Sequence, residues 1–125
     1  MKTFIEPFPA SNIFAHQRIA VGGWYNAQVH QVIFLQADRN YTQIHLADGG
    51  KMTVAICLKK LEKRFAIFDD FFRTHKSFLI NLNHIQNYDV IRNEIFVEMK
   101  NGYRIEVSRR KKMALRKRIN ELPNI

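Results

Sequence analysis

The sequence has a single cysteine, Cys57, so the chain cannot form an internal disulfide and we expect it to work in a reducing compartment. No run approaches the roughly 20 apolar residues that a membrane-spanning helix needs. The N-terminal segment is interrupted by Glu6, Pro7 and Pro9, so it lacks the continuous apolar stretch of a secretion signal. These absences predict a cytoplasmic protein without a membrane partner.

The sequence also lacks the patterns of common catalytic and metal sites. It has no second cysteine and no His-x-x-x-His on a predicted helix, and both Gly-Gly pairs are typical of β-turns rather than of phosphate-binding loops. Asp69 and Asp70 would suit a magnesium-dependent nuclease, although paired acids before an aromatic strand more often form a turn. We therefore expect no enzyme, no metal and no cofactor.

Acidic residues are scarce. The 125 residues include 20 Lys and Arg against 11 Asp and Glu, which gives a formal net charge of +9 and a pI near 10.0. This balance favours an anionic partner such as nucleic acid. The apolar fraction of 46% and the ten phenylalanines exclude a disordered chain and fit one folded domain.

Short alternating segments separated by turn signals predict a mainly β domain over residues 18–125. Residues 1–17, with two prolines and little periodicity, are expected to form an arm. Two hairpins have a predicted register, because one loop length places apolar residues opposite each other. A loop at 48–50 would pair Leu46 with Met52 and Ile44 with Val54, and a loop at 100–102 would pair Met99 with Tyr103 and Glu98 with Arg104.

Two segments have helical periodicity. In "LKKLEKRF" (58–65), Leu58, Leu61 and Phe65 form a short apolar stripe. In "RKKMALRKRINEL" (110–122), the apolar side is predicted to carry Met113, Leu115, Ile119 and Leu122.

The densest cationic feature runs from Arg109 to Arg118, where seven of ten residues are Lys or Arg and none is acidic. A solvated helix face usually mixes charges of both signs, because like charges at i and i+4 repel. A run of this kind is favoured when phosphates offset the repulsion. It therefore indicates contact with nucleic acid.

A second feature, "FFRTHKSFLINLNHI" (71–85), places a basic turn between two apolar strands. Arg73 and Lys76 suit phosphates or guanine edges, and Asn40, at an earlier strand junction, suits phosphate or adenine. Asn81 is expected to bond the backbone of a neighbouring loop. His45 is expected on a strand surface.

Four segments in order, "VIFLQADRNYTQIHLADGGKM", "LKKLEKRF", "FFRTHKSFLINLNHIQNY" and "NGYRIEVSRRKKMALRKR", make the chain resemble the LytTR-type DNA-binding domain over roughly residues 18–120. This domain is the output module of many bacterial response regulators. The F-x-R-x-H-x-S core and the later V-S-R-R carry the resemblance. It implies an elongated fold of about ten mostly antiparallel strands in three small sheets, one short helix between sheets and a short C-terminal helix.

The resemblance also implies a docking mode, in which loops rather than a recognition helix enter successive major grooves. The implied base contacts are Asn40, Tyr41, His75, Lys76 and Arg109. The implied phosphate contacts are Arg73, Arg110, Lys111 and Lys112. The family often has Ser or Thr before the first helix, whereas Cys57 stands there and is expected to cap it poorly.

The expected function is sequence-specific binding of double-stranded DNA by a bacterial transcriptional regulator, with two copies on a paired-repeat site. One alternative is a general RNA or single-strand binding module, which would need gathered aromatic side chains for stacking. Another is a protein-interaction module whose DNA contact is incidental and whose arm recruits the partner. We expect no receiver domain within these 125 residues, so the chain is either a free-standing regulator or a fragment of a longer one, and the upstream sensor or receiver partner stays open.

Overall fold

A computed structural model describes residues 17–22, 25–92 and 94–121. The expected arm at 1–17 lies outside this part of the chain except for Gln17. In chain order the elements are β1 (Arg18–Gly22), β2 (Tyr25–Gln28), η2 (Val29–Gln31), β3 (Val32–Asp38), β4 (Tyr41–Leu46), β5 (Lys51–Val54), α1 (Leu58–Phe65), β6 (Phe71–His75), β7 (Phe78–Asn81), η3 (Leu82–His84), β8 (Ile85–Ile91), β9 (Glu94–Met99), β10 (Arg104–Glu106), η4 (Arg109–Lys111) and α2 (Lys112–Glu121).

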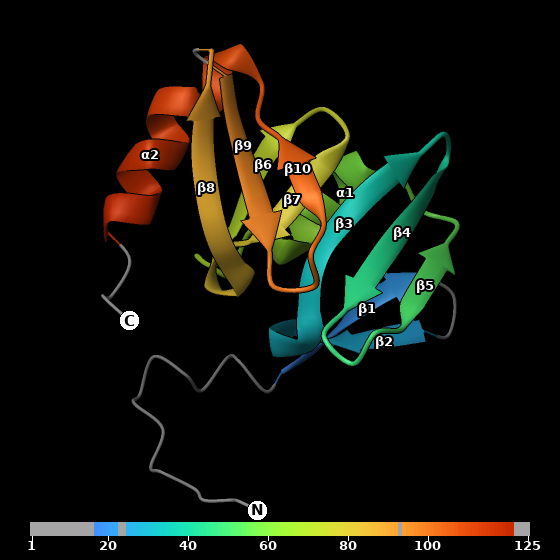
Figure 1. Ribbon diagram of the computed structural model, residues 1–125. Coiled ribbons are helices and arrows are strands. Elements are labelled where there is room, and N and C mark those ends of the chain that lie inside the picture. The colour runs from blue at the N-terminus through green and yellow to red at the C-terminus, as the bar shows by residue number, and fades with distance from the viewer. Residues whose placement is uncertain (1–16, 23–24, 93, 122–125) are drawn as a thin grey trace, which may run out of the picture.

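The ten strands in the described ranges form three antiparallel sheets, as the family resemblance implies (Figure 1). The largest sheet has the order β5-β4-β3-β7-β6, the second has the order β10-β9-β8, and β1 and β2 form a two-stranded sheet. Neither of the two described α-helices is long and apolar enough to cross a bilayer.

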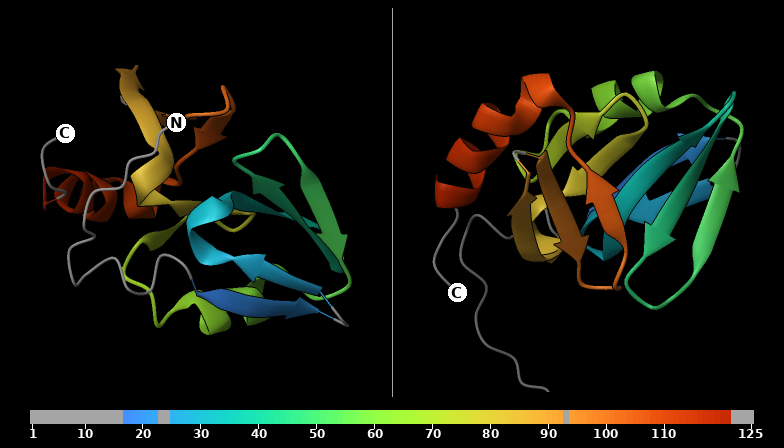
Figure 2. Two further views of the ribbon diagram at one scale, coloured as in Figure 1. Left: turned by 90° about the horizontal axis from the view of Figure 1, so that it is seen from below. Right: turned by 45° about the horizontal axis from the view of Figure 1, so that its top comes forward.

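The five-stranded sheet is buried on both faces, and this makes the fold layered. On one face, Val32 and Leu35 of β3 pack with α1 and the β1–β2 sheet; on the other face, Ile33 and Phe34 pack with β9 and β10. An irregularity in the strand pairing between Val32 and Phe34 interrupts the normal alternation and lets the consecutive residues Ile33 and Phe34 face the same layer. Figure 2 shows α1 and the three-stranded sheet on opposite sides of the five-stranded sheet.

The β9–β10 hairpin has the predicted register. Arg104 lies opposite Glu98, and Gly102 adopts a φ of 90°, which favours glycine in this tight loop. The register predicted for β4 and β5 is wrong by two residues, because Ile44 pairs with Met52 rather than with Val54. The Asp48 carboxylate accepts a hydrogen bond from the Gly50 N–H at 2.7 Å and stabilises a longer loop.

The helix predictions hold in part. The first helix spans Leu58–Phe65, and Cys57 at its N-cap makes no side-chain capping bond, as expected. The second helix buries Leu115, but Met113 is 79% exposed, because the chain first makes the 3₁₀ turn η4 and the helix begins only at Lys112. Leu122 lies outside the described residues.

Two polar predictions have opposite outcomes. Asn81 is structural, since its amide donates to the Val32 carbonyl at 3.0 Å and its side-chain oxygen accepts from the Asn83 N–H at 3.0 Å. His45 is buried rather than exposed. Its ring stacks on Phe34 with 4.1 Å between centroids and meets the edge of Tyr103, because the β9–β10 hairpin covers this face of the sheet.

Candidate nucleic-acid interface

Three segments that are far apart in the sequence meet at one end of the fold. They are the β3–β4 loop (39–41), the β6–β7 turn (75–77) and the segment 108–111 that contains η4. Both views that show this end place them side by side in a row, at the top of Figure 1 and in the right panel of Figure 2. We call these residues the loop end. The arrangement follows from topology, since β3 is antiparallel to both β4 and β7 and so finishes where they begin.

Two backbone hydrogen bonds fix the three segments relative to one another. The Ala37 N–H donates to the Ser77 carbonyl at 2.8 Å and ties the end of β3 to the β6–β7 turn. The Ser108 N–H donates to the Thr74 carbonyl at 2.7 Å and ties η4 to β6. The loop end is therefore anchored to the sheets, so that the backbone from which its side chains project is held in place.

The β6–β7 turn is shaped by an irregularity in strand pairing between Arg73 and His75. Thr74 is fully buried there, while Arg73 and His75 are partly accessible and Lys76 is exposed. Bulges of this kind re-aim side chains next to functional sites. The His75 Nδ1 accepts from the Ser77 N–H at 3.2 Å, so in the neutral ring the proton lies on Nε2, which leaves a donor for a ligand.

Arg73 is held within the protein. Its Nε donates to the His75 carbonyl at 2.9 Å, its Nη2 to the Lys76 carbonyl at 2.7 Å, and its Nη1 pairs with the Glu62 carboxylate at 2.5 Å. The Arg73 side chain is only 17% exposed. Glu62 comes from α1, and no local sequence pattern indicates that it belongs to the site.

The cations of the segment 108–111 are less engaged. Arg109 and Arg110 are exposed, and neither guanidinium has a hydrogen-bond or ion-pair partner among the described residues. The Lys111 ammonium lies 5.9 Å from the centroid of the Phe72 ring. Lys112 is partly buried at the start of α2.

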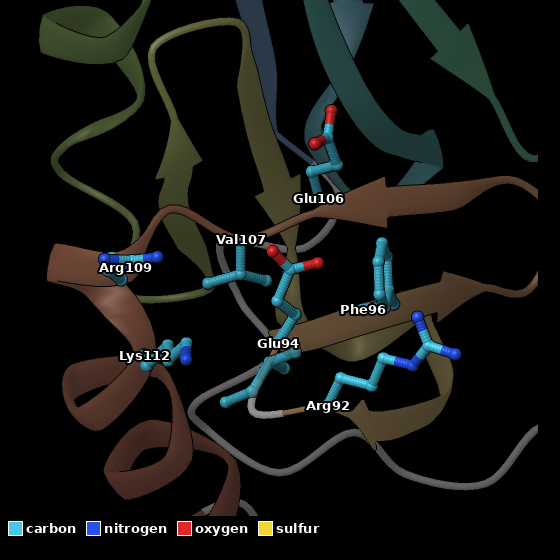
Figure 3. A pocket seen from close by; sticks show the side chains of 8 residues that line it. Arg92, Glu94, Phe96, Glu106, Val107, Arg109 and Lys112 are labelled. Carbon is cyan, nitrogen blue, oxygen red and sulfur yellow. The ribbon is translucent and has the colours of Figure 1, made fainter.

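A hollow of about 350 Å³ separates Arg109 and Lys112 from the end of the three-stranded sheet (Figure 3). Arg109 and Lys112 lie along one side of it, and Arg92, Glu94 and Phe96 lie along the other. Both charge signs are present, so this hollow has no strong preference for an anion.

A second hollow, of about 340 Å³, is lined by Arg73, His75, Lys76, Ser108, Arg110 and Lys111. We call it the cationic hollow. No carboxylate is among the described residues that line it. It joins the two basic features of the sequence, which are about 30 residues apart, into one surface with the charge that a phosphate backbone requires.

Asn40 and Tyr41 occupy the third segment of the loop end. Both are exposed, and the Tyr41 side chain is 51% exposed at the start of β4. Neither residue lines the cationic hollow. The loop end therefore brings all five predicted base-contact residues to one side of the molecule, with the cationic hollow between two of its three segments.

Comparison with known proteins agrees with this geometry. A family model described as the LytTr DNA-binding domain matches residues 22–120. The chain belongs to the LytTR family of DNA-binding domains. A solved structure of the LytTr DNA-binding domain from a Bacillus cereus protein described as a methyl-accepting/DNA response regulator is 25% identical, with a TM-score of 0.67, and the match covers 85% of this chain and 96% of that one. A search of curated proteins gives no match.

Membership in the family makes this LytTR domain a DNA-binding module of the kind found in regulators, and LytTR is not an enzyme family. Two contributors to the interface could not be found from the sequence. Glu62 forms a salt bridge with Arg73, eleven residues later in the sequence, and the Ser108 N–H donates to the Thr74 carbonyl, which lies much earlier in the chain. Both interactions depend on tertiary contacts that leave no local pattern.

Proposed function

We propose that this LytTR domain binds specific sequences of duplex DNA through its loop end and acts in a bacterial transcriptional regulator. The observation that supports this most is the anchoring of three polar segments in one row, with the cationic hollow beside them. An anchored row can address base edges in the major groove while cations bind the flanking phosphates. A flexible basic tail would supply only the electrostatic part of the affinity.

The side chains suggest a division of roles. Arg109 has a free planar fork that suits guanine O6 and N7, and the His75 Nε2–H and the Lys76 ammonium suit acceptors on base edges. Asn40 and Tyr41 would contact bases at the other end of the row. Arg110, Lys111 and Lys112 would bind phosphates. Arg110 and Lys111 line the cationic hollow, and Arg73 lines it with them. We further propose that two copies occupy a paired-repeat site.

The first experiment is selection from a random pool of duplex DNA near physiological salt, followed by sequencing. We expect enrichment of short motifs, with two repeats about one helical turn apart if copies bind in pairs. Single-stranded DNA and RNA of the enriched sequence should compete poorly. A pool that is retained but never enriched would refute sequence-specific binding.

The second experiment tests Arg109 on the selected duplex. Arg109→Ala should cost about 1–3 kcal/mol and relax the preference at one base position. Arg109→Lys should not restore that preference, because an ammonium lacks the fork. Arg18→Ala is the matched control, since it removes an exposed cation outside the loop end, and it should leave the base preference unchanged. An equal loss on all sequences with Arg109→Ala would remove Arg109 from base contact.

A further inference from the structure

Arg73 differs from the other cations of the cationic hollow, because its guanidinium is already engaged by the protein. Three of its five N–H donors are used, two by consecutive carbonyls of the β6–β7 turn and one by Glu62. The Arg110 guanidinium, in the same hollow, has no such partners in the described chain. The two arginines therefore have different chemical settings.

The contacts of Arg73 determine the shape of the turn. The rigid Arg73 guanidinium binds the carbonyls of His75 and Lys76, two consecutive residues of the turn, at the same time. Bridging consecutive carbonyls restricts the backbone that carries the His75 and Lys76 side chains. The bulge that buries Thr74 and the bond from Ser77 to His75 restrict the same few residues from the other side.

Glu62 orients the guanidinium from the opposite side. The carboxylate belongs to α1, whose Leu58, Leu61 and Phe65 are buried against the five-stranded sheet, so its position is tied to the core. It lies near a surface that is otherwise cationic, where a carboxylate weakens the attraction to phosphates. A positioning role accounts for this carboxylate, whereas a simple phosphate-binding role for Arg73 does not.

We propose that Arg73 is a positioning residue that holds the β6–β7 turn for base readout, and that Glu62 holds Arg73. Through this pair the short helix α1 contributes to sequence preference without a contact to DNA. The inference rests on the proposed function, because it concerns how His75 and Lys76 are presented to bases. Direct binding of a phosphate by Arg73 is the alternative.

The test compares Glu62→Gln, Arg73→Lys and wild type on the selected duplex and on a random duplex, over a range of salt concentrations. Glu98→Gln is the matched control, because it removes one carboxylate from β9, outside the loop end. Circular dichroism and thermal unfolding first establish that each variant is folded at the assay temperature. The amide signals of residues 75–77 in a ¹⁵N-labelled protein then report the conformation of the turn.

If Arg73 positions the turn, Arg73→Lys keeps the charge but loses the bridge, so the ratio of selected to random affinity should fall at least tenfold. The salt dependence on random duplex should stay unchanged. Glu62→Gln should lower the same ratio at least threefold and shift the amide signals of the turn. Glu98→Gln should change neither.

If Arg73 binds a phosphate, Arg73→Lys should keep the ratio near that of wild type, and Glu62→Gln should tighten both duplexes alike. That outcome, with wild type preferring the selected duplex, would overturn the inference and leave the proposed function standing. A wild-type protein without any preference would instead refute the proposed function, and the inference with it.

Discussion

Salt dependence offers a quantitative test of the cationic hollow. The change is Arg110→Ala combined with Lys111→Ala, which removes two cations that line it and leaves Arg73 and the β6–β7 turn in place. Each phosphate contact contributes about 0.9 to the slope of log Kd against log salt concentration, so losing two should reduce that slope by about 1.8. Between 50 and 200 mM salt, the double variant should therefore lose about tenfold less affinity than wild type.

The stability of the domain should hardly change in this variant. Arg110 is exposed and has no partner in the described residues, and Lys111 loses only its contact with the Phe72 ring, which is worth about 0.5–1 kcal/mol at an exposed site. Unfolding should therefore not confuse the binding data. The base preference should also stay as in wild type, because phosphate contacts carry no sequence information.

The assay is fluorescence anisotropy with a labelled duplex at several salt concentrations. A matched control is Lys59→Ala combined with Lys63→Ala, which removes the same charge from the exposed side of α1, outside the cationic hollow. The control should keep the wild-type slope. Equal slopes for all three proteins would refute the assignment of Arg110 and Lys111 to phosphates. An equal decrease of the slope in both variants would show that the effect comes from net charge alone.

Three further predictions concern stability, each measured by denaturant or thermal unfolding. Thr74→Val should raise the free energy of unfolding by up to about 1 kcal/mol, because the buried Thr74 hydroxyl has no hydrogen-bond partner in the described chain; a loss would show that the hydroxyl is satisfied. Cys57→Ser should add about 0.5–1 kcal/mol by capping α1, and an unchanged midpoint would contradict this. Burial, and to a lesser extent the charge of Lys51, lowers the pKa of His45 in the folded protein. As the pH drops below about 6.5, the unfolded chain is therefore protonated at this histidine before the folded chain, and the free energy of unfolding falls. His45→Phe should weaken the dependence of stability on acid pH. Some dependence should remain, because burial also lowers the pKa of His84; an unchanged pH profile would show that His45 does not contribute to it.

The sequence predicts local elements well where short-range chemistry decides them. The stripe Leu58, Leu61 and Phe65 gives the bounds of α1, and Gly102 gives the register of the β9–β10 hairpin. The β4–β5 register is wrong because alternation has a period of two, so two registers that differ by two residues place the same side chains on the same face. Hydrogen bonds within the loop distinguish them: the Gly50 N–H donates to the Asp48 carboxylate, and the Leu46 N–H donates to the Gly50 carbonyl.

The remaining errors come from tertiary contacts. His45 looks like a surface residue because it alternates with apolar neighbours, yet the β9–β10 hairpin, some 60 residues later, covers it with Tyr103. The candidate site shows the same limit. Cation-rich segments are visible in the sequence, but the Glu62 pairing that distinguishes Arg73 from Arg110 depends on how α1 packs against the sheet.

Not all seven cations between Arg109 and Arg118 are free to bind DNA phosphates. Arg118 donates to the Asp69 carbonyl and so ties α2 to the loop before β6. Arg109 is assigned to a base under the proposed function. At most five cations of the run then remain to bind phosphates, namely Arg110, Lys111, Lys112, Arg116 and Lys117. At about 0.9 per contact, they can contribute at most about 4.5 to the slope of log Kd against log salt concentration. A steeper measured slope would require phosphate contacts from elsewhere on the fold, and the exposed lysines of α1 would then be the first residues to test.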